Sequence, residues 1–558
     1  MSLDIVRFRI SQVLLLVGPL ATLAINPWSN FDPISVVKMT VISTLAFLVG
    51  FLMLSNTSLL LVAEKSLTIT LVVFISSLFS SLMFSGAPID QQVWGVFGRN
   101  TGLVAYLSLA IILFATAVVC DRNFYSRLVD AMILTAVPLS IYCFVQITGN
   151  DPIGWSSFET FGTLGNVNFL SAFLGMVCVA ISALVVNVGT PNWKKIMLSV
   201  LLLVDLYIVQ STGSIQGLVV FAVGLFVVLF IRLKSKAIIN VSQIGLVLFS
   251  VLLLIPSVAG LWNKGPFARF LFQNSNVLRT DYWHAGYEMT LSHPIFGVGM
   301  DSYGDWYRQT RGEISTLRGS ADRTANTAHN IYLDLSSNGG FPLLISSLLL
   351  SFFAIRASYR IYKRLGADRD FIFVALLSTW IGYQIQALVS INQLGVGVWG
   401  WLLTGALIGY EKCQRGTLDV AVRSLDKRKF KGKLLPAASA VMAITGMGFG
   451  FLLAWFPLNA DSRYFAAAKT RDLTQISNSL NVLGTTAWHR ARSIDTAYQA
   501  KSFDSAIDQA QNLVRRYPRD FFGWRYLLYA PNSSNELRAQ AFAKLQELDP
   551  FNPEFKRQ

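Results

Sequence analysis

Long apolar stretches alternate with short polar ones over the first four-fifths of the chain. Most of these stretches are close to the roughly 20 residues that a helix needs to cross a bilayer. We therefore predict an all-α, polytopic membrane protein with about 12–13 transmembrane helices. The thirteen candidate spans occupy residues 10–26, 36–54, 66–84, 102–119, 128–147, 167–186, 195–211, 214–232, 238–261, 331–355, 371–391, 395–410 and 436–457.

Two pairs of candidate spans are separated by very short connections. Only STGS stands between the seventh and eighth spans, and only NQLG between the eleventh and twelfth. Each pair is either a tight hairpin of two helices or a single broken element.

Lysine and arginine are concentrated in every second connection. If Arg7 and Arg9 lie inside, the other basic connections fall on the same side of the membrane. These are Lys65, Arg122 with Arg127, Lys194 with Lys195, and the segments 232–236, 356–369 and 426–433. Because basic residues are retained in cytoplasmic loops, we predict an odd number of spans and a cytoplasmic N-terminus. The loop 262–330 and the tail are then extracytoplasmic.

The overall composition agrees with this class of protein. Apolar residues make up 53% of the chain and charged residues only 14%, against about 25% charged residues in soluble domains. The net charge of +15 comes from basic runs between apolar segments, so we expect no nucleic-acid binding. The four cysteines form no CxxC pair and are interpreted as small buried apolar residues.

The tail beyond residue 457 differs from the rest of the chain. It is polar, rich in alanine and periodic at helical spacing, which predicts a helical domain over 458–558 after a transmembrane domain over 1–457. The segments NLVRRYPRDFFGW (512–524) and KLQELDPFNP (544–553) resemble tetratricopeptide helix pairs. Such a tail could bind a protein partner, or it could be a helical cap without a ligand.

The loop 262–330 is the longest connection between spans. It holds aromatic residues and six arginines but only one lysine, Lys264. Long loops in compact proteins are usually functional or disordered, and the planar fork of arginine suits a diphosphate. The alternative is a solvated basic loop that meets anionic lipid headgroups. The arginines are Arg269, Arg279, Arg308, Arg311, Arg318 and Arg323.

One of the four histidines, His329, stands where this loop meets the next apolar stretch. Cationic neighbours favour the neutral imidazole, which can accept a proton near neutral pH. The alternative is a capping or packing histidine. Asn330 stands where a helix should begin, and asparagine is a good helix cap. No HExxH, DxD, P-loop, GxSxG or dinucleotide-binding fingerprint is present, so we expect neither a metal nor a cofactor.

Four motifs in order resemble the O-antigen ligase and O-antigen polymerase family of bacterial membrane glycosyltransferases, over about residues 90–410. They are FGRNTGLVAYLSL (97–109), FGTLGNVNFLSAFL (161–174), RTDYWHAGYEMTLSHPIFGVGMDSYGDWY (279–307) and TAHNIYLDLSSNGGFPLL (327–344). The resemblance implies a location in the bacterial cytoplasmic membrane. It also implies transfer of a glycan from an undecaprenyl-diphosphate carrier to a hydroxyl of a lipid, glycan or protein acceptor.

The resemblance also implies roles for particular residues. Arg99 and Arg279 match arginines that contact phosphate or are structurally placed, and His329 matches the proposed general base. Asn330 belongs to the motif of His329, and Asn166 and Asn168 belong to the second motif. We expect these residues to bind the donor or its glycan.

The chain departs from the family pattern at two places. Many members carry SRG where this chain has QSTGSIQG, and there Gln216 stands nearest to the missing arginine. Arg318 or Arg323 could supply the lost phosphate contact. Near the eleventh span, where many members have an aspartate or a histidine–serine pair, the chain reads LVSINQLG, with Ser390 and Asn392.

Two other classes of function stay open at this stage. A transporter or flippase needs ionisable residues within its spans, for which Asp205 is the clear candidate. A non-catalytic scaffold would use the tail as its binding module and would tolerate alanine at His329 and Arg279. Within the transferase class, the added tail favours a protein or cell-wall acceptor over a lipid core.

Overall fold

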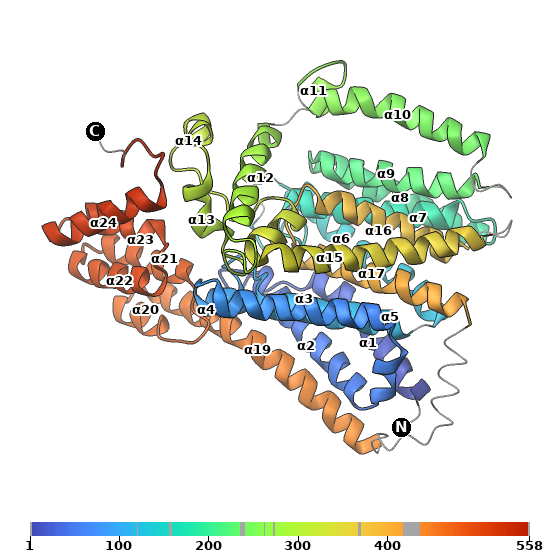
Figure 1. Cartoon of the computed structure of the whole chain (residues 1–558), viewed down its shortest axis with the longest axis horizontal. Coiled ribbons are helices and arrows are strands. Elements are labelled where there is room, and N and C mark those ends of the chain that lie inside the picture. The colour runs from blue at the N-terminus through green and yellow to red at the C-terminus, as the bar shows by residue number, and fades with distance from the viewer. Residues whose placement is uncertain are drawn as a thin grey trace.

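The computed structural model describes residues 3–119, 121–155, 159–234, 240–261, 263–271, 274–365, 370–416 and 436–555. Within these ranges the chain is all-helical, which confirms the predicted fold class, and a long helix stands at each of the thirteen predicted positions (Figure 1). They are α1 (Leu3–Leu23), α2 (Ser35–Leu54), α3 (Lys65–Phe84), α5 (Leu103–Val119), α6 (Arg122–Ile147), α7 (Val167–Val185), α8 (Asn192–Ser211), α9 (Ile215–Arg232), α10 (Val241–Leu261), α15 (Ile331–Arg364), α16 (Phe371–Ala387), α17 (Leu394–Gln414) and α19 (Pro436–Thr470).

Nine helices of the described part are long and apolar enough to cross a membrane, so the chain is a multi-pass membrane protein. Helices α5 and α16 are apolar but shorter. Both doubtful pairs are separate helices. A turn at residues 212–214 divides α8 from α9, and residues 388–393 divide α16 from α17.

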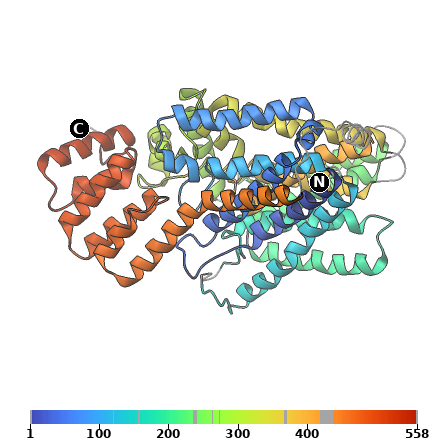
Figure 2. The same ribbon diagram turned by 90° about the horizontal axis from the view of Figure 1, so that it is seen from below.

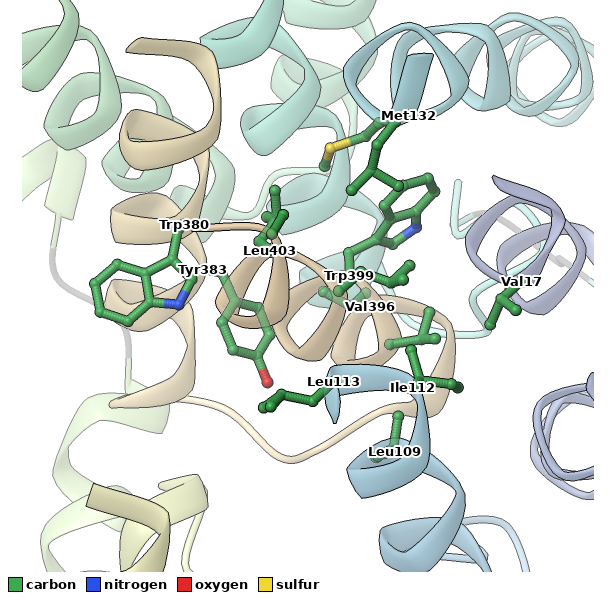
Figure 3. Packing of buried hydrophobic residues seen from close by; sticks show 14 of the residues in the cluster. Val17, Leu109, Ile112, Leu113, Met132, Trp380, Tyr383, Val396, Trp399 and Leu403 are labelled. Atoms are coloured by element: carbon green, nitrogen blue, oxygen red, sulfur yellow. The ribbon is translucent and has the colours of Figure 1, made fainter. Parts of the chain in front are cut away.

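The centre of the bundle is packed around Trp399 of α17, which is fully buried (Figure 3). Its indole N–H donates to the hydroxyl of Thr22 in α1 at 2.9 Å, so this polar atom has a partner in the apolar interior. Leu113 of α5 and Tyr383 of α16 lie in the same cluster. By contrast, α10 stands apart from the bundle in Figure 1 and exposes most of its apolar side chains, as a lipid-facing helix would.

Asp205 and Lys38 are ionisable side chains that are buried within the membrane helices. Asp205 of α8 accepts a hydrogen bond from the hydroxyl of Ser140 at 2.7 Å. Lys38 of α2, within the second predicted span, donates to the carbonyls of Ala21, Thr22 and Ala24. The lysine therefore satisfies the last carbonyls of α1, which otherwise lack partners within their own helix.

The connections gather at opposite ends of the bundle. At one end, here called the loop end, Ser35 donates to the carbonyl of Gly98, and Thr163 to that of Thr22. The opposite end is here called the basic end. It is tied by ion pairs of Arg122 with Asp370 (3.7 Å), Arg364 with Glu411 (2.7 Å) and Arg415 with Glu64 (3.2 Å).

This separation agrees with the predicted alternation of connections. The basic end holds the described residues that were predicted to lie inside, whereas 235–236, 366–369 and 426–433 are outside the described residues. The loop end holds the connection 262–330 and the tail. That the basic end faces the cytoplasm stays a prediction.

The loop 262–330 and the tail are both helical. The loop forms α11 (Ala268–Leu271), α12 (Asn274–Ser292), α13 (Tyr303–Thr310) and α14 (Glu313–Gly319), and a short α4 (Ile89–Trp94) lies beside them. The tail contains α20 (Leu473–Ser479), α21 (Ala487–Gln499), α22 (Phe503–Arg516), α23 (Phe521–Tyr529) and α24 (Asn535–Leu548). Its helices stack on one another at one end of the molecule (Figure 2). Their relation to tetratricopeptide repeats stays a prediction.

Helix α19 joins the tail to the bundle without a break. It begins at Pro436 and ends at Thr470, so the expected boundary at residue 457 lies inside one helix. A continuous helix fixes the direction in which the tail leaves the membrane.

The orientation can be tested by cysteine labelling in a background whose four native cysteines are replaced by alanine. Ser477 in the tail and Lys363 at the basic end are both exposed. We expect a membrane-impermeant maleimide to label Ser477→Cys on spheroplasts, and Lys363→Cys only after the membrane is permeabilised. The opposite pattern would invert the assignment of sides.

Candidate functional site

His329 lies in a tight turn just before α15. Its backbone has a φ of +52°, a left-handed conformation that is uncommon for residues other than glycine. Its N–H donates to the hydroxyl of Thr327 at 3.2 Å. Its ring stacks on Tyr282 of α12, with 5.4 Å between ring centroids and 27° between planes. The imidazole thus packs against α12.

Asp334, in the first turn of α15, holds this turn in place. Its carboxylate accepts from the N–H of Ala328 at 2.8 Å and from the hydroxyl of Thr327. The side chain is buried. No motif in the sequence singled out this residue, although the N-terminus of a helix favours an acidic residue in its first turn.

Asn330 is the N-cap of α15. Its side-chain oxygen accepts from the N–H groups of Tyr332 and Leu333, at 3.0 and 3.2 Å. This confirms the helix-cap interpretation of Asn330. A contact of Asn330 with the substrate stays a prediction.

Arg99 is placed between two buried carboxylates. It forms ion pairs with Asp301 at 3.2 Å and with Asp334 at 4.0 Å, and its side chain is 10% exposed. It also donates to the carbonyl of Asn326. Asp301 in turn accepts from the N–H of Val96 at 2.8 Å. Of the two roles that the family resemblance offered, this geometry favours the structural one, because the charge of Arg99 is already balanced.

Arg279 is in a different situation. It lies on α12, three residues before the tyrosine that stacks on His329, and it is partly buried. Among the described residues, no carboxylate lies within ion-pair distance of its guanidinium. Burial lowers the pKa of Arg279, but a guanidinium stays charged at every physiological pH. This arginine is therefore a cation available to a ligand.

The other two predicted arginines lie farther along the same loop. Arg318 forms an ion pair with Asp281 at 3.0 Å, and its side chain is 40% exposed. Arg323 is exposed. The backbone carbonyl of Arg323 accepts a hydrogen bond from Arg311 at 2.7 Å, and this contact holds the backbone at that position.

The asparagines of the second motif lie at the start of α7. Asn166 caps that helix by accepting from the N–H of Asn168 at 2.8 Å. The amide oxygen of Asn168 accepts from the hydroxyl of Ser214 at 2.7 Å. The segment 161–174, which resembles the family pattern, thus packs against the segment around Ser214, which departs from it. Gln216 is buried beside them and, within the described chain, both atoms of its amide lack hydrogen-bond partners.

A cavity of about 240 Å³ opens beside Arg99 at the loop end. Its polar lining includes Asn392, whose buried amide also lacks hydrogen-bond partners among the described residues. Buried amides without partners are costly unless a ligand or water satisfies them. Three aromatic residues, Phe31, Phe97 and Phe169, are part of the lining.

Two family-like motifs meet at a bend in α15. Gly340 has a φ of +72° inside this helix, and a side chain there would lie 2.5 Å from the carbonyl oxygen of Ile295. The N–H of Val298 donates to the carbonyl of Ser337, and that of Phe341 to the carbonyl of Pro294. The bend thus fixes the loop segment 294–299 against the helix that follows His329.

The electrostatic setting keeps His329 neutral. Burial, and then the charges of Arg279 and Arg99, lower its pKa to about 4. Above about pH 5 the imidazole is therefore uncharged and can accept a proton. Among the described residues, no group of three or more histidine, cysteine, aspartate or glutamate side chains could hold a metal ion.

Residues 197–348 match the model of the family described as O-antigen ligase. The matched segment includes Arg279, Arg318, Arg323, His329 and Asn330, whereas Arg99, Asn166 and Asn168 lie outside it. No curated protein matches the chain at a significant level. Together with the membrane helices, the family match supports a multi-pass membrane glycosyltransferase of the O-antigen ligase or polymerase type.

The difference between the two arginines leads to a stability prediction. Arg99→Met leaves Asp301 and Asp334 buried without their cation, so we expect it to destabilise the protein by about 3–5 kcal/mol. Arg279→Met removes no ion pair with a described residue, and we expect a loss below about 1 kcal/mol. Thermal unfolding of the purified protein in detergent, followed by tryptophan fluorescence, measures both. Equal losses would contradict the structural role of Arg99.

Proposed function

We propose that this protein transfers a glycan from undecaprenyl diphosphate to an acceptor hydroxyl at the outer face of the bacterial cytoplasmic membrane. One observation carries the proposal. Within the segment that matches the family, Arg279, which has no carboxylate partner among the described residues, lies beside a neutral histidine, His329. A departing diphosphate needs the first group, and an attacking hydroxyl needs the second.

The proposed role of Arg279 is to bind the diphosphate. Its guanidinium presents parallel N–H donors that match phosphate oxygens, and the partly buried position strengthens the attraction. Arg318 and Arg323, on the same loop, would add positive charge where the donor approaches. Tyr282 stacks on His329 and lies one helical turn after Arg279. The proposed phosphate site would therefore lie next to the proposed base.

The proposed role of His329 is that of general base. The acceptor oxygen attacks the anomeric carbon of the donor glycan while its proton passes to the imidazole. The bond between that carbon and the diphosphate oxygen breaks, and undecaprenyl diphosphate leaves with the electron pair. A new glycosidic bond replaces the phosphate ester, so the step needs no nucleotide, oxidant or reductant.

Arg99 has a positioning role in this proposal. Through Asp334 it connects to the turn that carries His329, and through Asp301 to the segment that follows α12. The cavity beside Arg99 would receive part of the glycan, whose hydroxyls could pair with the buried amide of Asn392.

Donor, acceptor and membrane lipids are the partners of this reaction. The acceptor would be a lipid core, a growing glycan, or a serine or threonine of a protein. The transporter alternative is not favoured by the two mid-span groups Asp205 and Lys38, because Asp205 is paired with Ser140 and Lys38 with the end of α1. These two buried groups have structural partners of their own.

The proposal predicts a defined loss of function in a host deleted for this gene. We expect His329→Ala and Arg279→Ala to reduce transfer by about 10²–10⁴-fold, since each removes a group that acts on the transition state. Surface glycan should disappear while its lipid-linked precursor accumulates. The readouts are a gel ladder and the extracted lipid-linked glycan, at matched membrane expression.

Arg515→Ala is the matched control, because Arg515 is an exposed arginine of the tail. It should retain the wild-type ladder. Loss of ladder length with retained attachment would indicate a polymerase, and loss of attachment a ligase or a protein-glycosylating enzyme. If His329→Ala and Arg279→Ala both retain the surface glycan, the transferase site is not here.

The low pKa of His329 predicts an unusual pH profile. Because the neutral form is the base, the transfer rate should stay level from about pH 8 to pH 5 and fall only near pH 4. A histidine with an ordinary pKa would lose activity near pH 6.5. Since His329 has a lower pKa when folded, protonation of the unfolded chain also weakens stability below pH 6.5. Thermal unfolding over the same range therefore accompanies the rate measurement.

A further inference from the structure

The tail contacts three of the segments that form the candidate site. It reaches the loop 303–323, the segment that carries Arg99, and the connection between α1 and α2. In Figure 1 the tail and helices α12–α14 lie at the same end of the bundle. These contacts include buried ion pairs and stacked rings, which hold the tail and the loops in a defined relative position.

The first contact is a buried ion-pair cluster around Asp549, at the end of α24. Its carboxylate accepts from Arg311 at 2.7 and 2.9 Å and from Arg308 at 3.1 Å. The side chain of Arg311 is 1% exposed and that of Asp549 is fully buried. Arg311 also donates to the carbonyls of Ala321 and Arg323. Asp549 thereby anchors the chain that leads directly to the turn of His329.

The second contact supports the segment that carries Arg99. Trp488 of α21 stacks on Phe97, with 4.0 Å between ring centroids and 3° between planes. Phe97 is two residues from Arg99 and lines the same cavity. The next tail residue, His489, makes a buried contact of 3.0 Å with Asp461 of α19. Asp461 in turn accepts from the N–H of Asp32, in the cavity wall, at 2.9 Å.

The third contact joins the tail to α4 and α13. Asp90 of α4 accepts from Arg516 at 2.9 Å and from Tyr517 at 2.7 Å. The guanidinium of Arg519 lies 3.6 Å from the ring centroid of Trp306 in α13. Cation–π contacts of this kind are favourable when they are shielded from water.

We infer that the tail is a clamp that positions the site loops, with Asp549 and Trp488 as positioning residues. This inference rests on the proposed function, because it assigns the tail a part in the same transfer reaction. A free binding module would leave its surface open to a partner, whereas this tail uses charged and aromatic side chains to hold the chain's own loops. Burying Arg311 and Asp549 is costly unless they meet in one geometry, so the pair selects one docked position.

The test uses the full chain with single substitutions at Asp549. Asp549→Asn keeps the shape but removes the charge, and Asp549→Glu keeps the charge. Asp508→Ala, at an exposed carboxylate of α22, is the matched control. The transfer rate is measured in membranes with the lipid-linked glycan extracted from the His329→Ala strain, per amount of folded protein.

We expect Asp549→Asn to lower kcat by about ten- to a hundredfold, since small misplacements of reacting groups are that costly. Asp549→Glu should recover most of the rate, and Asp508→Ala should match wild type. Trp488→Ala should behave like Asp549→Asn, with recovery in Trp488→Phe. Wild-type rates in both Asp549→Asn and Trp488→Ala would overturn the clamp.

Hydrogen exchange separates this inference from the proposed function. In Asp549→Asn, we expect faster exchange in residues 303–328 while the membrane helices keep their protection. If His329→Ala and Arg279→Ala have no effect on glycan but this exchange still increases, the tail clamps the loops and the proposed reaction is wrong. If Arg279→Ala abolishes transfer while Asp549→Asn changes neither rate nor exchange, the clamp is wrong and the reaction stands. If Asp549→Asn does not fold, Trp488→Ala alone decides by the same criteria.

Discussion

The charge of Arg99, buried between Asp301 and Asp334, joins three parts of the chain that are far apart in sequence. A buried cation must be balanced closely, since leaving it or its partners alone costs several kcal/mol. That requirement fixes the segment before α5, the end of the 279–301 segment and the start of α15 against one another. Asp334 also accepts a hydrogen bond from the turn that carries His329. The ion pair therefore helps to fix the position of the candidate base.

The need to balance a buried charge also distinguishes Arg99 from Arg279, two arginines that the motifs alone do not separate. Arg99 has two carboxylates and a carbonyl as partners, whereas Arg279 has no ion pair within the described residues. An arginine that is already neutralised holds structure, and one that is not can attract an anion. The neutral state of His329 follows from the same arrangement, because two nearby cations and burial disfavour its protonation.

The membrane part and the tail are joined at the loop end by a continuous helix and by side-chain contacts. Helix α19 passes from the bundle into the tail without a break, and the tail returns to the loops through Asp549, Trp488 and Arg516. Because helices that cross a bilayer leave their loops exposed to water, a site at the loop end needs other elements to hold it. Here the chain's own C-terminal helices supply that support.

The sequence by itself determined the fold class, the positions of the thirteen long helices and the separation of basic from other connections, because length, hydropathy and charge act locally along the chain. It also predicted Asn330 as a helix cap, which depends on neighbours one turn away. Only the tertiary structure decided that Asp301 and Asp334 flank Arg99, that Asn166 and Asn168 serve helix and loop contacts, and that Asp549 lies against Arg311. These pairings join residues up to 238 positions apart, and no local pattern encodes which distant charges will be buried together.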